Sequence, residues 1–163
     1  MTPTEHASSL LKFVRSISTG LLKDMPDSAM LRQNAPTDNH ALWVMGHLAL
    51  TDSWITGVVG AQGVRIPDSY KKVFDAGTTP VSDPKVYPPV AEVREVFDAA
   101  RAALIQWLES APQSALTVSL KEKTGGFALD PIDAVHKIAW HEGWHFGQVA
   151  SVRKSLKLPP VMG

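Results

Sequence analysis

The stretch that most constrains this chain lies near its C-terminus, where residues 139–148 read A-W-H-E-G-W-H-F-G-Q. On a helix, His141 and His145 stand one turn apart on the same face, where two imidazoles can bind one metal ion. Two histidines at ligand spacing are costlier to bury than leucines, so the pattern favours a metal site over two hydrogen-bonded core histidines. The face continues in both directions with spacings of 4, 3, 4, 3 and 4 residues, typical of an inward helical stripe: Ala134, Ile138, His141, His145, Gln148 and Val152.

The same letters match H-E-x-x-H, the helix motif of zinc peptidases in which the glutamate acts as general base. A peptidase also needs a third ligand downstream, but the eighteen residues after His145 contain no His, Asp, Glu or Cys. The extended motif fails as well, because Ser151 stands where its third histidine would be. A third ligand must therefore come from upstream, which disfavours the peptidase interpretation.

Composition narrows the chemistry further. The 163 residues carry sixteen basic and sixteen acidic side chains with no basic block, so we expect no nucleic-acid partner. The chain has no cysteine, so a metal site must use histidines and carboxylates, and no protein thiol serves as nucleophile. The longest apolar run, residues 41–50, is interrupted by His47 and too short to span a membrane. With no signal-peptide core near Glu5 and His6, we expect a cytoplasmic protein.

Hydrophobic periodicity and capping residues predict four helices, at residues 5–24, 39–59, 90–110 and 131–155. Residues 36–39 supply cap candidates for the second helix, and Asp130 with Pro131 should begin the fourth. A long connection at 60–89, rich in glycine and proline and anchored by Tyr70, Val73 and Phe74, joins the second helix to the third. A short extended excursion or hairpin is expected near 117–126. The predicted fold is therefore an all-α four-helix bundle, one domain over residues 1–163, with a long second connection. On the first helix, the residues predicted to face the core are Leu10, Phe13, Val14, Ile17 and Leu21.

His47 is the only polar member of the stripe predicted for the second helix, which consists of Trp43, His47, Leu50, Trp54 and Val58. It is either a buried histidine with a hydrogen-bond partner or the missing upstream ligand, and the His141/His145 pair favours the ligand. His40, two turns earlier, is expected to cap the helix or to be exposed, whereas His136 falls off the inward stripe. Gly46 either lets another backbone approach closely or has a plain packing role.

Two segments resemble the signatures of the DinB-like family of four-helix-bundle metal proteins. Residues 39–48 read N-H-A-L-W-V-M-G-H-L, and residues 141–148 read H-E-G-W-H-F-G-Q, close to the usual H-x-x-x-H-x-G-Q. The loop at 74–80 and the tail at 156–160 are also similar to family members. The resemblance implies a divalent metal ion, commonly nickel or zinc, on His47, His141 and His145. Relatives include bacillithiol S-transferases and mycothiol-dependent maleylpyruvate isomerases.

The expected chemistry follows from an open three-histidine site, since a divalent ion lowers the pKa of a thiol or water that it binds. Without a cysteine, the protein would activate a low-molecular-weight thiol toward a small-molecule substrate. Gln148 and Glu142 are the candidate catalytic residues. Gln148 either orients water or substrate or satisfies a backbone group. Glu142, turned about 100° from His141, is more suited to a supporting or surface contact than to general-base work.

Three functional classes remain open at this point. They are a metal-dependent thiol transferase or isomerase, a metal-dependent hydrolase that uses bound water, and a non-catalytic metal- or ligand-binding protein. The third class predicts a fourth protein ligand that closes the site, for which His40 and Glu142 are candidates. Tryptophans 43, 54, 140 and 144 either form the wall of an apolar pocket or pack in the core. A homodimer is a further expectation.

Overall fold

The computed structural model describes residues 1–161 and contains four long helices, α1 (Pro3–Leu22), α2 (Ala41–Val58), α4 (Val90–Ser110) and α6 (Pro131–Ser155). Two short helices, α3 (Asp68–Phe74) and α5 (Gln113–Leu116), and two 3-10 turns (Asp27–Ala29 and Pro84–Val86) lie in the connections. No strand occurs within residues 1–161, so the predicted all-α class is confirmed. The last two residues of the predicted domain lie outside this range.

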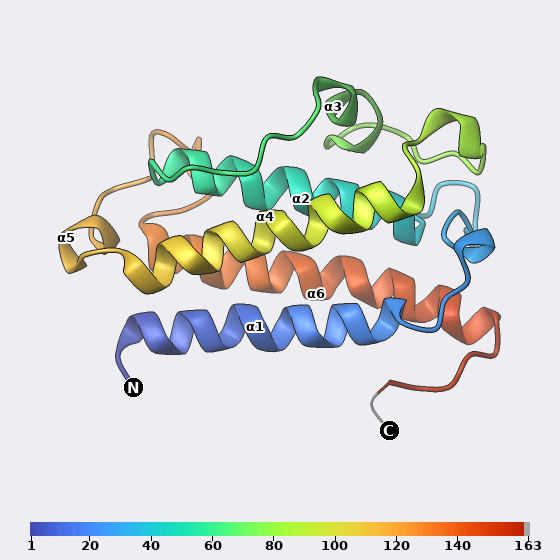
Figure 1. Ribbon diagram of the computed structural model, residues 1–163, viewed down its shortest axis with the longest axis horizontal. Helices are drawn as coiled ribbons and strands as arrows, with labels where there is room; N and C mark the ends of the chain where they lie inside the picture. Colours follow the sequence, from blue (N-terminus) through green and yellow to red (C-terminus); the bar gives the residue numbers. More distant parts are fainter. Residues whose placement is uncertain (162–163) are drawn as a thin grey trace.

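The long helices form a bundle in which α1 and α6 run in one direction and α2 and α4 in the other (Figure 1). The closest packing is between α2 and α4 and between α1 and α6, so each helix lies beside a parallel neighbour. A chain that leaves α2 must therefore travel back about 27 Å, the length of its 18 residues, before α4 begins. This return explains the long connection that the glycines and prolines of residues 60–89 predicted. None of the helices within residues 1–161 is long and apolar enough to cross a membrane.

Capping residues set the helix ends close to the predicted positions. Asp130 caps α6 by accepting a hydrogen bond from the backbone N–H of Asp133, and Pro131 occupies the first helical position, both as predicted. For α2 the prediction of a cap within residues 36–39 is wrong. The Nδ1 atom of His40 accepts the hydrogen bond from the Trp43 N–H instead, which confirms the alternative that His40 caps the helix.

The long connection covers the outer side of α2. Tyr70 and Phe74 of α3 are fully buried, which confirms them as the anchors of this segment. As a result every residue of Ala41–Ala49 is buried, because the bundle lies on one side of that half of α2 and the connection on the other. Trp54, beyond the covered part, is 42% exposed, so the predicted inward stripe is correct for Trp43 and wrong for Trp54.

The hairpin expected near residues 117–126 is absent. One backbone hydrogen bond, from Leu120 N to Leu129 O at 2.9 Å, joins the two arms, and the residues between them form turns. The hydroxyl of Thr124 takes the place of a strand ladder. It accepts from the Ala128 N–H at 3.0 Å and lies 2.8 Å from the Leu120 carbonyl oxygen, to which it donates. This segment therefore folds as a compact loop before α6.

The buried face of α1 differs from the predicted one. Phe13 is 60% exposed, and the other members of the predicted stripe are only partly buried. The buried residues of α1 are Ala7, Ser8, Leu11, Arg15, Ser18 and Leu22. Three of them, Ser8, Arg15 and Ser18, are polar. Hydrophobicity alone selected the wrong stripe because the true one contains Arg15, whose charge is neutralised by residues of the other three helices.

Four buried charges, one from each long helix, meet in the interior of the bundle. Arg15 of α1, Asp52 of α2, Arg101 of α4 and Glu142 of α6 are each at most 9% exposed. Arg15 bonds Glu142 at 2.9 Å and Asp52 at 3.1 Å. Arg101 bonds the same two carboxylates at 2.6 and 2.9 Å. Both cations therefore contact both anions, so the cluster has no net charge.

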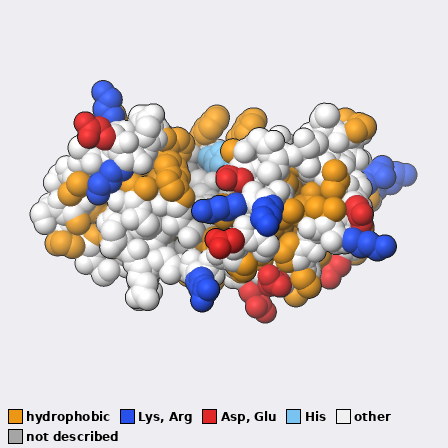
Figure 2. Space-filling view, turned by 90° about the horizontal axis from the view of Figure 1, so that it is seen from above, with side chains coloured by type: hydrophobic (Ala, Val, Ile, Leu, Met, Phe, Trp, Pro, Cys, Tyr) orange, Lys and Arg blue, Asp and Glu red, His pale blue; other side chains and the backbone are white. Residues whose placement is uncertain are grey.

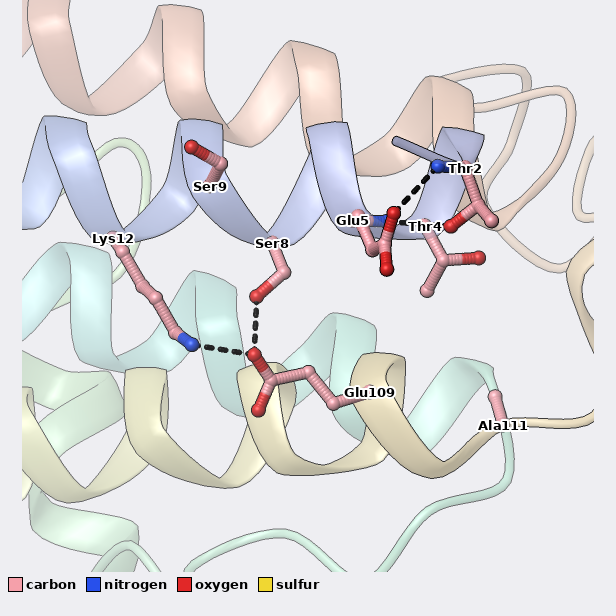
Figure 3. Close-up of a pocket in the computed structure, with 8 residues that line it drawn as sticks. All are labelled: Thr2, Thr4, Glu5, Ser8, Ser9, Lys12, Glu109 and Ala111. Carbon is pink, nitrogen blue, oxygen red and sulfur yellow. Dashed lines mark hydrogen bonds and ion pairs between the residues drawn. The ribbon is translucent and has the colours of Figure 1, made fainter.

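Arg101→Met should lower the free energy of unfolding by about 3–5 kcal/mol, because it leaves two buried carboxylates with one cation. Urea denaturation followed by circular dichroism measures this change. The control is Glu109→Gln. Glu109 of α4 contacts Lys12 and Ser8 of α1 near the surface of the bundle (Figure 3). Equal shifts in the two variants would contradict a dominant role for the buried cluster.

Candidate metal centre

His47 of α2 and His141 and His145 of α6 meet at one point on the side of the bundle. The Nε2 atom of His141 lies 3.3 Å from that of His47 and 3.0 Å from that of His145. One ring nitrogen from each of the three lies within 4.8 Å of the others. The structure thus brings together the three residues that the sequence predicted as ligands, although they lie as much as 98 positions apart.

The His47 ring is fixed on one face and at one nitrogen. Its Nδ1 lies 3.0 Å from the carbonyl oxygen of Phe74, to which it donates. The indole of Trp43 stacks on it at 4.6 Å with an angle of 10° between the rings. Trp43 is held in turn by a hydrogen bond from its Nε1 to Thr78. With the proton on Nδ1, the lone pair of Nε2 points to the centre.

Gln148 orients His145 in a similar way. The Oε1 atom of Gln148 lies 3.3 Å from Nδ1 of His145 and also accepts a hydrogen bond of 3.0 Å from Asn39. This places the proton of His145 on Nδ1 and leaves Nε2 unprotonated. The oxygen of Gln148 is thus engaged with a candidate ligand. By contrast, Nδ1 of His141 is buried without a hydrogen-bond partner within residues 1–161.

Gly46 makes the contact between α2 and the long connection close enough to reach His47. A Cβ atom at this position would lie 2.4 Å from Cγ of Phe74 and 2.5 Å from its neighbouring ring carbons. Such distances are sterically forbidden, so only glycine lets the Phe74 ring rest on the helix. The carbonyl oxygen of Phe74 then reaches the imidazole one position further along. The Phe74 side chain, and no backbone, approaches Gly46, so of the two alternatives for this glycine the packing role is the one observed.

Burial keeps the three imidazoles neutral. It lowers the pKa of His141 to about 4, with a smaller contribution from the charge of His47. Burial also lowers the pKa of His145 to about 3, supported by His141 and His47. The pKa of His47 is lowered by burial too, although the Phe74 carbonyl and the charge of Asp75 oppose the change. Near neutral pH all three rings therefore offer lone pairs without competition from protons.

These donors suit a divalent transition-metal ion. Imidazole is a preferred ligand of zinc, copper, iron and nickel. Two nitrogens bound tetrahedrally at about 2.05 Å would be separated by about 3.3 Å, and the separations here are 3.0 and 3.3 Å. Converging lone pairs repel one another unless a cation or a proton lies between them. The residues present thus fit a metal ion bound by three imidazoles.

Neither candidate for a fourth ligand joins the three histidines. The side chain of His40 is fully buried, with Nδ1 at the start of α2 and Nε2 3.1 Å from the Val81 carbonyl. Glu142 lies in the charge cluster, where both of its oxygens contact arginines. Burial raises the pKa of Glu142, but the charges of Arg101 and Arg15 outweigh it and hold this pKa below its ordinary value. The side chain of Glu142 is fully buried, so the alternative of a surface contact is wrong, and its oxygens contact arginines and no ligand histidine. Its catalytic role stays a prediction.

The centre opens to solvent through a cavity of about 290 Å³. Two of the histidines line it, His47 and His141, together with Leu50, Thr51, Trp54, Asp75, Ala76 and Phe127. The space-filling view shows histidine at the surface between hydrophobic side chains (Figure 2). A small molecule can therefore reach the imidazoles. Two of the tryptophans for which core packing was an alternative, Trp140 and Trp144, are 68% and 55% exposed, so core packing does not explain them.

Comparison with known proteins identifies the family of the chain. The family model of the DinB superfamily matches residues 10–149, which is most of the chain. The chain belongs to the DinB superfamily. The match includes α2, the long connection and the part of α6 that carries His141 and His145. The cluster of His47, His141 and His145 is called the DinB site below. No curated protein matches the chain. The family and the predicted fold are thus established, together with three histidines that can hold a metal ion in this DinB protein.

Sequence reasoning missed several residues that shape the DinB site. Asn39 and Asp75 lie in two segments that resembled the family, yet Asn39 was predicted only as a candidate helix cap and Asp75 was assigned no role. Phe127 was hidden because a loop residue has no periodic signal. The contribution of Phe74 is a backbone carbonyl, which carries no sequence signature. Gly46 gave the one usable clue, since a glycine beside a ligand histidine within a helix indicates close approach.

His47→Ala, His141→Ala and His145→Ala should each weaken metal binding by more than about 100-fold, the usual upper loss for residues that merely support a ligand. The control is His136→Ala on the exposed side of α6, which should keep full metal content. Metal content after purification, measured by plasma mass spectrometry, checks both. Full occupancy in His47→Ala would exclude that residue from the centre.

The lowered histidine pKa values also predict how binding depends on pH. An unperturbed imidazole with a pKa of about 6.5 would begin to lose metal to protons below neutrality. Here the affinity should persist to a pH below 6.5, because burial lowers all three pKa values, and it should be lost as the pH approaches the values of about 4 for His141 and about 3 for His145. Zinc titrations against a chelator at each pH measure this. A loss of affinity beginning already near pH 6.5 would contradict it.

The lowered pKa values also predict how the free energy of unfolding of the metal-free protein depends on pH. Because the folded-state pKa of His141 is about 4 and the unfolded value about 6.5, the unfolded chain takes up protons first. The free energy of unfolding should therefore be undiminished above about pH 6.5 and decrease as the pH falls toward 4.

Proposed function

We propose that this protein is a metal-dependent enzyme of the thiol S-transferase or isomerase type, which activates a low-molecular-weight thiol toward a small-molecule substrate. The observation that carries the proposal is a centre of three neutral imidazoles that opens directly into a cavity of about 290 Å³. A purely structural site would be closed by a fourth protein ligand. Both candidates for that ligand are bound elsewhere in the fold.

Each of the three histidines supplies one Nε2 atom for the ion, which we propose to be zinc or nickel. When bound, such an ion supplies Lewis acidity that makes a thiol or water acidic near neutral pH. Phe74 and Gln148 hold the tautomers of His47 and His145, so both rings present Nε2 to the ion. The chain has no cysteine, and the thiol must therefore enter through the cavity.

Gln148 acts in this proposal as a positioning residue. Its oxygen holds His145, which leaves the amide nitrogen as the group that can contact a ligand. Gln148→Ala should weaken metal binding by about 10–100-fold, the usual effect of removing a partner of a ligand histidine. The role of Glu142 would be to fix α6 next to His141 through Arg15 and Arg101. A direct catalytic role for either residue remains part of the proposal.

A metal-dependent hydrolase is the second candidate, because the same open centre suits an activated water. A hydrolase gains from a nearby general base, and the three clustered histidines cannot serve as one while they bind the ion. Asp75, which lines the cavity, is the residue that would serve such a hydrolase.

Loading the protein with zinc or nickel and combining thiols with electrophilic substrates tests the proposal. We expect turnover that requires both metal and thiol, and that falls to the uncatalysed rate in His145→Ala. Bacillithiol, mycothiol and glutathione should each be compared, with esters and amides as substrates for hydrolysis. His136→Ala is the matched control and should keep full activity. Ester hydrolysis without thiol would favour the hydrolase, and inactivity throughout would leave metal binding as the function.

We also propose a cytoplasmic location and a homodimer. The cytoplasm keeps low-molecular-weight thiols reduced, as the proposed reaction needs. A homodimer is supported by the outer side of α6, where the exposed rings of Trp140 and Trp144 stack at 6.1 Å. Between Lys137 and Arg153 the only charged residue of α6 is Glu142, which is buried. Aromatic surfaces depleted of charge are typical of the centres of protein interfaces.

A further inference from the structure

The cavity beside the three histidines has two chemically different walls. One wall is aromatic and comes from Trp54 of α2 and Phe127 of the loop before α6. These two rings lie 5.6 Å apart and are tilted by 57°. They remain 42% and 36% exposed, although both are large hydrophobic side chains. An apolar or aromatic group of a ligand would remove them from water, which favours binding of such a group.

The other wall carries a single charge. Asp75 is the only residue with a formal charge among the described residues that line the cavity, and Lys and Arg are absent from them. The charge that a ligand meets at the wall itself is therefore negative.

The position of Asp75 is fixed by the same contacts that fix His47. The preceding residue, Phe74, is fully buried against Gly46 and accepts the hydrogen bond from His47. Oδ1 of Asp75 accepts a hydrogen bond of 2.9 Å from the backbone N–H of Ala76. These contacts hold the carboxylate at the cavity rim, with Oδ2 free to meet a ligand in the part of the chain that the structure describes.

We propose that this cavity selects small ligands with an apolar or aromatic group and a neutral or cationic end, and that Asp75 is the residue that disfavours anionic ligands. The inference rests on the proposed function, because it states the chemical class of the thiol or electrophile that the enzyme would use. A cavity of about 290 Å³ limits the ligand to roughly the size of a substituted benzene ring or a little more. Thiols rich in carboxylates would be poor partners for this site.

The experiment compares three thiols of equal size on the metal-loaded protein: 4-(aminomethyl)thiophenol, which is cationic, 4-methylthiophenol, which is neutral, and 4-mercaptobenzoate, which is anionic. Isothermal titration calorimetry at low salt gives each Kd. We expect the cationic thiol to bind about tenfold more tightly than the anionic one, and the ratio to shrink as salt screens the charge. In Asp75→Asn the ratio should fall to about one with the metal content unchanged.

Two further variants complete the test. Asp68→Asn removes an exposed carboxylate of α3 that does not line the cavity, and it should keep the wild-type ratio. Phe127→Ala should weaken all three thiols by a similar factor and leave the ratio unchanged. Equal Kd values for the three thiols in wild type, an unchanged ratio in Asp75→Asn, or loss of metal from that variant would each overturn the inference.

A last arm separates this inference from the proposed function. Benzylammonium and benzyl alcohol contain no thiol, and their binding to metal-free protein is followed by the fluorescence of Trp54 and its neighbours. A preference for benzylammonium that disappears in Asp75→Asn supports the inference even if no thiol reaction is found. A protein that binds metal and turns over thiols but shows no such preference retains the proposed function and loses the inference.

Discussion

Two arginines and two carboxylates, one from each long helix, meet in the interior of this bundle. Burial of an unpaired ion costs several kcal/mol, so each of the four charges is stable there only while its partners stay in place. A rotation or a one-turn shift of any helix would separate at least one of these pairs. The cluster therefore fixes how the four helices face one another, beyond what contacts between apolar side chains require.

The metal centre depends on that constraint through adjacent residues of α6. Glu142 of the cluster directly follows His141 of the centre, so the orientation that pairs Glu142 with Arg15 and Arg101 also turns His141 toward α2. His145, one turn later, follows the same side of the helix. A cluster of paired charges and a neutral, open centre thus lie on neighbouring sides of one helix. The paired charges support the centre without occupying it.

The long connection has a second role that follows from topology. Parallel α2 and α4 require the chain to return along the bundle, and the returning segment passes over the half of α2 that carries His47. There it supplies the carbonyl of Phe74, the hydroxyl of Thr78 that holds Trp43, and the carboxylate of Asp75. One wall of the centre thus belongs to a segment that the fold needs for connectivity alone.

Much of this protein was determined by local sequence. The bounds of the long helices follow from periodicity and capping residues, and the spacing of His141 and His145 places both imidazoles on one side of α6 whatever surrounds them. The buried face of α1, the exposure of Trp54, Trp140 and Trp144, and the approach of Phe74 and Asp75 to His47 were decided only by the tertiary structure. The physical reason is that periodicity assigns charged residues to the surface. Arg15 and Glu142 can be buried only because partners distant in sequence neutralise them, and no local pattern records those partners.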